Sequence, residues 1–388
     1  MGTPAGGQTF GTYIVYEQIG KGGMATVHRA EMRDKNGKLV PIALKRLLPK
    51  AAAHKEIVAS FLQESKLLEE LHHPGIMETY ESGKVFGHYF IAMEYIPGPT
   101  LKELVAQCGT TVGAVPEPIT LNIAAQLCDA LHHAHTKKDG KGRALGIIHR
   151  DISPANIILS TDGIVKLIDW GLAKAQLTKE DTGETHIKGK YGYVAPEYLG
   201  GKLSPRSDLW AVGIIMYELL TSRRLFDGAN DFETVSRVKN MPIPRPSIMN
   251  PKVTAQLDQI VMKALERDPT YRWKTAREMS EAMREVIAQP GYYTDNAHVT
   301  EWVKWVYTQK PGTAASGISH LHSIVTSKNA PEITPSQLAA QAIEDHTVPS
   351  GPPLAMEEPT PRLTGSRYTG FWIALAFVVA ALIAWRVT

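Results

Sequence analysis

Cysteine is almost absent from this chain of 388 residues, which contains only Cys108 and Cys128. Two thiols are too few for a disulfide framework, so the sequence excludes the class of small secreted domains that disulfides hold together. The shortage fits a reducing compartment. We expect both side chains to be ordinary buried thiols.

An excess of charge of one sign is also lacking. The chain has 42 basic and 39 acidic side chains, a net charge of +3. It contains no basic stretch interleaved with aromatic residues, so we expect no nucleic-acid partner. The overall balance, 43% apolar and 21% charged, is typical of a globular chain. Homodimerisation is compatible with the sequence, but no feature supports it.

Long hydrophobic runs are missing from all but the C-terminal end. The first eight residues contain neither a charged start nor an apolar run, which argues against a secretory signal. The uncharged run 371–385 would span roughly 22 Å as a helix, short of the ~30 Å bilayer core. Adding its neighbours, with Arg386 reaching the interface, predicts a transmembrane helix over 368–387. The alternative is a C-terminal helix docked on a domain, which would usually keep a polar stripe.

The residues before this run indicate its orientation. Arg362 and Arg367 precede it, and the positive-inside rule then places the preceding part of the chain in the cytoplasm. We therefore expect a single-pass protein of the cell membrane. Residues 311–367 are rich in Pro, Ser, Thr and Ala, which predicts a disordered juxtamembrane linker.

The most informative stretch is IIHRDISPANIIL, residues 147–159. Apolar residues at both ends anchor it in a core, so its polar middle must be satisfied at a surface or around a ligand. Asp151 can accept a proton from a hydroxyl group, and the amide oxygen of Asn156 can bind a hard cation such as Mg²⁺. The stretch resembles the catalytic loop H-R-D-x-x-x-x-N of protein kinases.

A glycine-rich segment lies near the N-terminus, between two strand-like runs. Its glycines interrupt any regular element and let backbone N–H groups approach phosphate oxygens. A flexible hairpin tip is the alternative. The segment resembles the kinase pattern G-x-G-x-x-G-x-V, with alanine in place of the third glycine. The resemblance implies that the nucleotide is held by Ile19, Gly20, Lys21, Gly22, Gly23, Met24, Ala25 and Val27.

Lys45 lies within the apolar strand predicted for 40–47, where an unpaired ammonium group would be costly. The strand resembles the V-A-I-K motif, which implies that Lys45 holds the α- and β-phosphates of ATP. Its implied partner is Glu64, on a helix predicted over 61–71. Helical periodicity places Glu64 on the same face as the apolar residues of this helix.

The strand predicted for 89–96 resembles the hinge between the two lobes of a kinase. The resemblance implies that Met93 borders the adenine site and that the backbone of Glu94 and Ile96 bonds to the adenine edge. Ala43 and Val27 would then form its walls. We expect the side chain of Glu94 to face solvent.

Further motifs follow in the order that the kinase family uses. Asp169-Trp170-Gly171 resembles D-F-G, which implies that Asp169 joins Asn156 as a Mg²⁺ ligand. Residues 195–197 resemble A-P-E, and residues 208–213 resemble the helix that supports the catalytic loop. Arg272, in a D-P-x-x-R element, is implied to pair with Glu197.

Taken together, these motifs resemble those of eukaryotic-like bacterial Ser/Thr protein kinases. The resemblance implies an α+β bilobal fold, with a five-stranded antiparallel sheet and one helix in the N-lobe and a mostly helical C-lobe. The expected divisions, in chain order, are a disordered segment 1–10, a kinase domain 11–289 (lobes 11–95 and 96–289), a helical extension 290–310, the linker and the transmembrane helix. A helix predicted over 297–309 would pack on the C-lobe or bind a partner.

The implied activity is transfer of the γ-phosphoryl group of ATP to Ser or Thr hydroxyls of proteins, with Mg²⁺ or Mn²⁺ and with Asp151 as the catalytic base. One departure stands out. The family usually has a lysine where this chain has Ser153, and a threonine where it has Lys190. We hypothesise that Lys190 reaches the γ-phosphate and replaces the missing lysine; alternatively it binds the acceptor or faces solvent.

Two other functions stay open. A pseudokinase would act as a scaffold or binding module, and a kinase could also act on tyrosine or on a small molecule. Arg150 beside the catalytic Asp predicts control by phosphorylation of the activation segment; the candidate sites are Thr178, Thr182 and Thr185. A cluster of histidines on one predicted helix could suggest a metal site, but the spacing lacks further ligands, so we expect packing roles for His132, His133 and His135.

Overall fold

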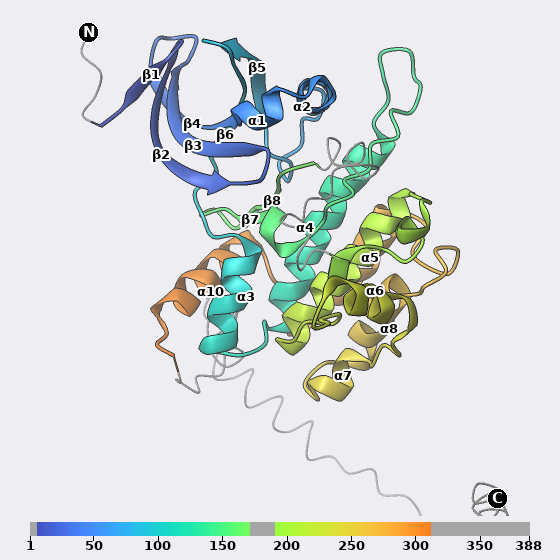
Figure 1. Cartoon of the computed structure of the whole chain (residues 1–388). Coiled ribbons are helices and arrows are strands. Elements are labelled where there is room, and N and C mark those ends of the chain that lie inside the picture. Colours follow the sequence, from blue (N-terminus) through green and yellow to red (C-terminus); the bar gives the residue numbers. More distant parts are fainter. Residues whose placement is uncertain (1–5, 171–190, 312–388) are drawn as a thin grey trace, which may run out of the picture. The chain divides into compact units, whose positions relative to one another are not determined.

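The structure is a computed structural model, and it describes residues 6–170 and 191–311 (Figure 1). Four of the predicted features lie outside these residues: Lys190, the candidate phosphorylation sites, nearly all of the linker, and the transmembrane helix over 368–387. Within the described ranges, no helix is both long enough and apolar enough to cross a bilayer.

The N-terminal lobe is built on one antiparallel sheet in the order β1-β2-β3-β4-β6-β5. Successive side chains of β4 point to opposite faces of the sheet: Ile42 and Leu44 are fully buried in a small core on one face, and Ala43 between them is buried in a second cluster. The strands are β1 (Gln8–Phe10), β2 (Tyr13–Lys21), β3 (Ala25–Arg33), β4 (Leu39–Leu47), β5 (Thr79–Val85) and β6 (His88–Glu94).

The sheet has six strands rather than the five expected, because Gln8–Phe10 pairs with β2. The prediction that residues 1–10 are disordered is therefore wrong for this strand. The physical reason is burial: the Phe10 ring lies edge-on to Phe90, with centroids 5.8 Å apart. In addition, the Tyr13 hydroxyl on β2 donates a hydrogen bond to Glu81 on β5, although these two strands are not neighbours in the sheet.

Two helices connect β4 to β5, namely α1 (Pro49–Ala52) and α2 (Lys55–Leu68). The α2 helix begins before the predicted range of 61–71 and ends three residues before the end of that range. Its buried face carries Phe61, Glu64 and Leu68. Glu64 is the charged residue on this buried face, and it pairs with Lys45.

The C-terminal lobe is mostly helical. Its helices are α3 (Leu101–Thr110), α4 (Glu117–Thr136), α5 (Pro205–Thr221), α6 (Asp231–Asn240), α7 (Pro246–Met249), α8 (Ala255–Ala264), α9 (Ala276–Ile287) and α10 (Asn296–Thr308). Helix α5 is buried around almost its whole circumference and forms the centre of the lobe with α4.

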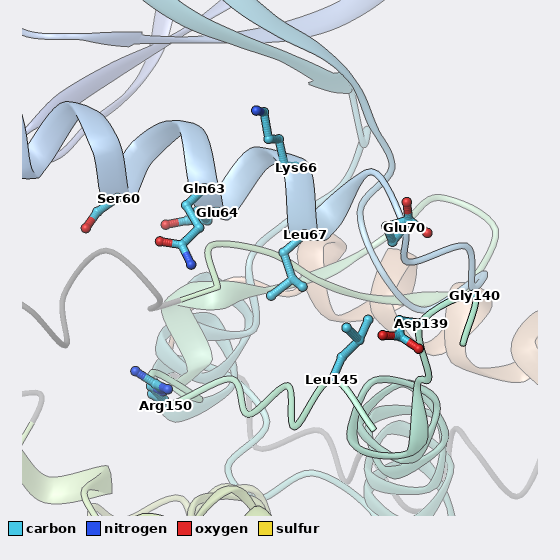
Figure 2. A pocket seen from close by; sticks show the side chains of 10 residues that line it. All are labelled: Ser60, Gln63, Glu64, Lys66, Leu67, Glu70, Asp139, Gly140, Leu145 and Arg150. Carbon is cyan, nitrogen blue, oxygen red and sulfur yellow. The ribbon is translucent and has the colours of Figure 1, made fainter. Parts of the chain in front are cut away.

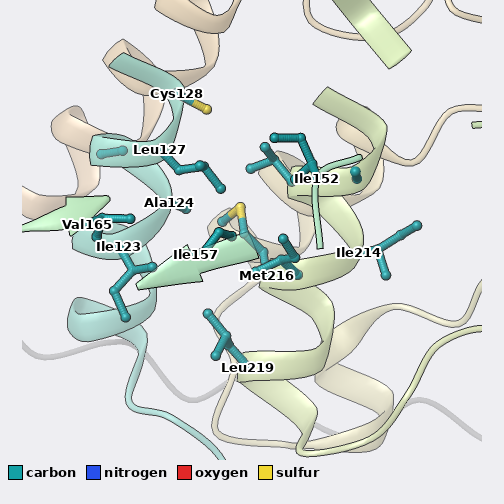
Figure 3. Close-up of a cluster of buried hydrophobic side chains, with 14 of the residues drawn as sticks. Ile123, Ala124, Leu127, Cys128, Ile152, Ile157, Val165, Ile214, Met216 and Leu219 are labelled. Carbon is teal, nitrogen blue, oxygen red and sulfur yellow. The ribbon is translucent and has the colours of Figure 1, made fainter. Parts of the chain in front are cut away.

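A two-stranded ribbon, β7 (Ile157–Leu159) and β8 (Val165–Leu167), lies on this helical core. Ile157 points between Leu127 of α4 and Met216 of α5, and all three side chains are fully buried (Figure 3). The ribbon follows Asn156 and precedes Asp169. Packing of its apolar side chains therefore anchors both ends of the predicted catalytic machinery.

The helix predicted for 297–309 is α10, and it packs on the C-terminal lobe rather than standing free. Val299, Trp302 and Val306 on one side of it are fully buried. Two of the three histidines on α4 have side-chain partners: His135 bonds to Asp208, and the ring of His133 lies against His73. Among the described residues, no group of three or more His, Cys, Asp or Glu side chains could hold a metal ion.

Candidate active site

The buried carboxylate of Asp208, on the first turns of α5, holds the segment around Asp151. It accepts hydrogen bonds from the backbone N–H groups of His149 at 2.9 Å and Arg150 at 3.0 Å, and its Oδ2 lies 2.8 Å from Nε2 of His135. Burial alone would raise the pKa of Asp208, but its hydrogen bonds with His135 and with the backbone of His149 hold this pKa below its usual value. These bonds also hold Arg150 at φ +70°, a conformation that non-glycine residues rarely adopt.

The side chains of Asp151 and Asn156 are joined directly. The Asn156 amide nitrogen donates to the Asp151 carboxylate at 2.8 Å and to its backbone oxygen at 2.7 Å. This fixes the orientation of the carboxylate. Because the amide nitrogen is engaged in these bonds, the group of Asn156 with ligand chemistry is its oxygen, an acceptor suited to a hard cation.

Lys45 brings the two lobes together. Its ammonium nitrogen lies 2.5 Å from a carboxylate oxygen of Asp169 and 3.7 Å from one of Glu64. Burial alone would lower the pKa of Lys45, but these two carboxylates outweigh it and raise the pKa, so the group stays charged. Asp169 also adopts a strained backbone conformation, with φ +57°.

A nucleoside triphosphate with its Mg²⁺ fits this set of donors and acceptors. The Lys45 ammonium group suits phosphate oxygens, whereas the oxygens of Asp169 and Asn156 are ligands that Mg²⁺ prefers. They converge because the backbone N–H of Ile168, next to Asp169, donates to the carbonyl of Asn156 at 2.9 Å.

His149 connects the catalytic segment to the segment containing Asp169, a role that the sequence did not predict. Burial lowers its pKa, so the ring is neutral. Its Nδ1 accepts from the N–H of Asp151 at 3.3 Å, and its Nε2 then donates to the Ile168 carbonyl at 3.1 Å. The ring also packs on buried Trp170, with centroids 4.7 Å apart. Its position in H-R-D was the available signal.

The predicted adenine site is an apolar cluster between the lobes. It includes four residues that the sequence assigned to it, namely Val27, Ala43, Met93 and Ile96. Three others complete it, Met77, Ile158 and Ile168. Ile158 lies two residues after Asn156, and Ile168 directly precedes Asp169. Their closeness in the sequence to the predicted Mg²⁺ ligands was a usable signal. Nothing local distinguishes Met77, because it joins the cluster only through tertiary packing.

The hinge differs from expectation at Glu94. Its side chain does not simply face solvent: it pairs with Lys166 of β8 at 2.7 Å and accepts the N–H of Glu78 at 3.1 Å. The reason is that β8 pairs beside residues 75–77, which brings Lys166 to the end of β6. The N–H of Glu94 donates to the Glu78 carbonyl at 2.9 Å, so its carbonyl is the group that an adenine could use. Ile96 lies beyond the end of β6.

The glycine-rich segment forms the turn between β2 and β3. Neither Gly20 nor Gly22 has a positive φ, and a Cβ at either would make ordinary contacts of 3.4 Å and 3.6 Å. The fold itself therefore does not require glycine there, and close approach of a ligand is the remaining reason. The partly buried side chain of Met24 packs against the apolar cluster that includes Leu47 and Phe61.

A separate cavity of about 480 Å³ lies between α2 and the segment that leads to Asp151. Leu67 of α2 and Leu145 of that segment point toward one another across it (Figure 2). Glu64 and Arg150 also line the cavity. Glu64 thus belongs both to this cavity and to the Lys45 pair.

The implied pair between Arg272 and Glu197 is present. Two guanidinium nitrogens each lie 2.7 Å from a carboxylate oxygen, and the Arg272 side chain is fully buried. Burial alone would raise the pKa of Glu197, but the bonds from Arg272 lower it. The pair holds the segment after the activation region against the core and has a structural role.

Comparison with known proteins agrees with this geometry. Residues 13–285 match the family described as protein kinase domain. The chain belongs to the protein kinase family.

Several bacterial relatives show the same likeness. The chain is 32% identical to the tyrosine-protein kinase MasK of Myxococcus xanthus (73% of this chain, 44% of that protein) and 34% identical to the serine/threonine-protein kinase PrkC of Bacillus subtilis (69% and 39%). It is 32% identical to PknL of Mycobacterium tuberculosis (72% and 67%). The chain thus spans less than half the length of the first two relatives. The PknI kinase domain of M. tuberculosis is similar in structure, with TM-score 0.56, 28% identity, and 72% and 98% coverage.

Asp208→Asn should lower both the melting temperature and kcat. An amide NH₂ in place of one acceptor oxygen faces a backbone or imidazole N–H donor, and an unsatisfied buried group costs about 1–3 kcal/mol. Thermal unfolding and a phosphoryl-transfer assay measure the two effects. Glu233→Gln, at an exposed ion pair with Arg237, is the control and should change little. An unchanged kcat in Asp208→Asn would show that this carboxylate does not hold the catalytic segment.

Proposed function

We propose that this chain is an active protein kinase that transfers the γ-phosphoryl group of ATP to Ser or Thr hydroxyls of protein substrates. The observation that carries the proposal is the convergence of Lys45, Glu64 and Asp169 with Asp151 and Asn156 in one site. A pseudokinase that served only as a scaffold or binding module would not need all five groups. Autophosphorylation is expected of such an enzyme.

Phosphoryl transfer depends on positioning and charge neutralisation more than on covalent chemistry. Lys45, held by Glu64, orients the α- and β-phosphates of ATP. Asp169 and Asn156 would hold Mg²⁺ or Mn²⁺, and the bound ion would supply positive charge to neutralise the phosphates. Asp151, oriented by its bond to Asn156, aligns the acceptor hydroxyl and takes its proton.

Transfer to tyrosine is the second candidate. Of the relatives compared, PrkC is by name a serine/threonine-protein kinase, whereas MasK is by name a tyrosine-protein kinase. Ser153, two residues after Asp151, is buried, and no ammonium group occupies that position as it does in the Ser/Thr family pattern. The acceptor therefore has to be identified directly.

The purified chain, incubated with labelled ATP and Mg²⁺, should label itself and a general acceptor protein. Asp151→Asn should reduce transfer by about 10²–10⁴-fold, because the general base is lost. Acid hydrolysis and phosphoamino-acid analysis then identify the acceptor, with phosphoserine or phosphothreonine expected. Phosphotyrosine alone would favour the second candidate. Equal labelling by Asp151→Asn would sink the proposed role of Asp151, and no transfer by the unaltered chain would support a pseudokinase.

We further propose that Lys190 supplies the cation that Ser153 does not. The Ser153 hydroxyl is buried and has no hydrogen-bond partner among the described residues, so this position contributes no charge to the γ-phosphate. Cationic groups at developing phosphoryl charge contribute to transition-state stabilisation.

Lys190→Ala should lower kcat by about tenfold or more while leaving the KM for ATP nearly unchanged, because the contact would form in the transition state. Steady-state kinetics measure both. Lys45→Ala is the reference for loss of phosphate contact. If Lys190→Ala keeps full kcat while Lys45→Ala abolishes activity, Lys190 does not compensate for Ser153.

We also propose that residues 368–387 anchor the chain in the cell membrane as a single-pass helix, with the kinase domain in the cytoplasm. Support comes from the uncharged run 371–385 and from the arginines that precede it.

Val378→Asp should release the chain from the membrane fraction, because an acidic group at the centre of a span costs about 2.5–3.5 kcal/mol. Fractionation with an alkaline wash measures the membrane-bound share. Ser366→Asp adds the same charge just before the run and should stay membrane-bound. Recovery of the unaltered chain in the soluble fraction would contradict the anchor.

A further inference from the structure

Helix α10 follows the region that matches the kinase family, which ends at residue 285, yet it is a well-packed part of the C-terminal lobe. It lies beside α3 and also contacts α4 (Figure 1, orange). The Gln107 amide on α3 donates to the carbonyl of Val306 at 3.4 Å. The question is what this added helix holds in place.

The first turns of α10 press on the turn between β7 and β8. Gly163 in that turn has φ +73°, and a Cβ built there would lie 2.0 Å from the backbone oxygen of Asn296 and 2.8 Å from the hydroxyl of Thr300. The Thr300 hydroxyl donates to the carbonyl of Thr161 at 3.4 Å. The turn and the helix therefore touch backbone to backbone, with no space for a side chain between them.

The side chain of Gln126 on α4 contacts α10, the β7–β8 turn and β8. Its amide nitrogen, which carries two hydrogens, lies 2.7 Å from the side-chain oxygen of Asn122, 3.1 Å from that of Asn296 and 3.1 Å from the carbonyl of Gly163. Its amide oxygen accepts the N–H of Val165 on β8 at 3.1 Å. One side chain thus ties the start of α10 to both the turn and the second strand of the ribbon.

The ribbon also bonds to the segment that leaves the hinge. The N–H of Leu159 donates to the carbonyl of Pro99 at 2.9 Å, and the N–H of Thr161 donates to the carbonyl of Pro97 at 3.0 Å. Ile158, which directly precedes Leu159 on β7, packs in the adenine cluster with Ile96. The ribbon therefore contacts α10 at its turn and the hinge segment along β7 and the turn.

We propose that α10 is a positioning element of the nucleotide site: by holding the β7–β8 turn, it sets the position of Ile158 and of the hinge segment 97–99. The catalytic unit then extends to Thr308, beyond the family's boundary. The inference rests on the proposed function only for nucleotide binding, not for phosphoryl transfer.

The decisive comparison is Gly163→Ala against Gly37→Ala in the full chain. Both glycines have φ near +75°, so both substitutions carry a similar backbone strain, but no atom lies within 4 Å of a Cβ at position 37. Titration calorimetry with Mg²⁺ and a non-hydrolysable ATP analogue should show a Kd raised about fivefold or more in Gly163→Ala and nearly unchanged in Gly37→Ala. The KM for ATP should rise in parallel, with the KM for the acceptor unchanged.

A milder pair keeps the inference testable if Gly163→Ala does not fold. Asn296→Ala removes the bond to Gln126 without strain, and Tyr307→Ala alters a side chain of α10 that is 45% exposed. Asn296→Ala should weaken the binding of the analogue, and Tyr307→Ala should not. All titrations are made well below each variant's melting temperature.

An unchanged Kd in both Gly163→Ala and Asn296→Ala, whatever their melting temperatures, would show that α10 only stabilises the lobe. A chain that binds the analogue but transfers no phosphoryl group would refute the proposed kinase activity and leave this comparison valid.

Discussion

The geometry of the active site depends on one buried carboxylate. Asp208 accepts bonds from the backbone N–H groups of His149 and Arg150 and lies against an imidazole, and these contacts keep Arg150 in a conformation that an isolated chain would avoid. Because the carboxylate is on α5, the most buried helix, the strain is held by the core of the lobe. The position of Asp151 follows directly from this arrangement.

A second set of charges links the lobes. Lys45 from the sheet meets Asp169, which follows the ribbon, and Glu64 from α2, and each of these elements is anchored by its own apolar face. A like arrangement recurs at the hinge, where Glu94 pairs with Lys166. Movement of α2 or of the ribbon would therefore change the contacts of the residues assigned to ATP. The cavity behind Glu64 leaves α2 less tightly packed on that side.

Contacts between residues that belong to short motifs with fixed spacing could be predicted well. The pairing of Lys45 with Glu64, that of Arg272 with Glu197, and four members of the adenine cluster were all implied by the resemblance of short motifs to those of the kinase family. Contacts made by residues outside these motifs could not be predicted. Met77 joins the adenine cluster, and Glu94 meets Lys166, because β8 pairs beside residues 75–77. The strand formed by Gln8–Phe10 depends on Phe90, which lies eighty residues further along the chain.

By itself, the sequence determined the chemistry of the site, because the nature and spacing of an ammonium group, carboxylates and an amide within recognisable motifs specify which groups can hold phosphates and a cation. Only the tertiary structure decided how those groups are held. Burial lowers the pKa of His149 and so makes it a neutral link between two segments, and α10 reaches the nucleotide site only through the ribbon that it supports. These relations arise from packing between residues far apart in the chain, and the local sequence around each residue does not predict such contacts.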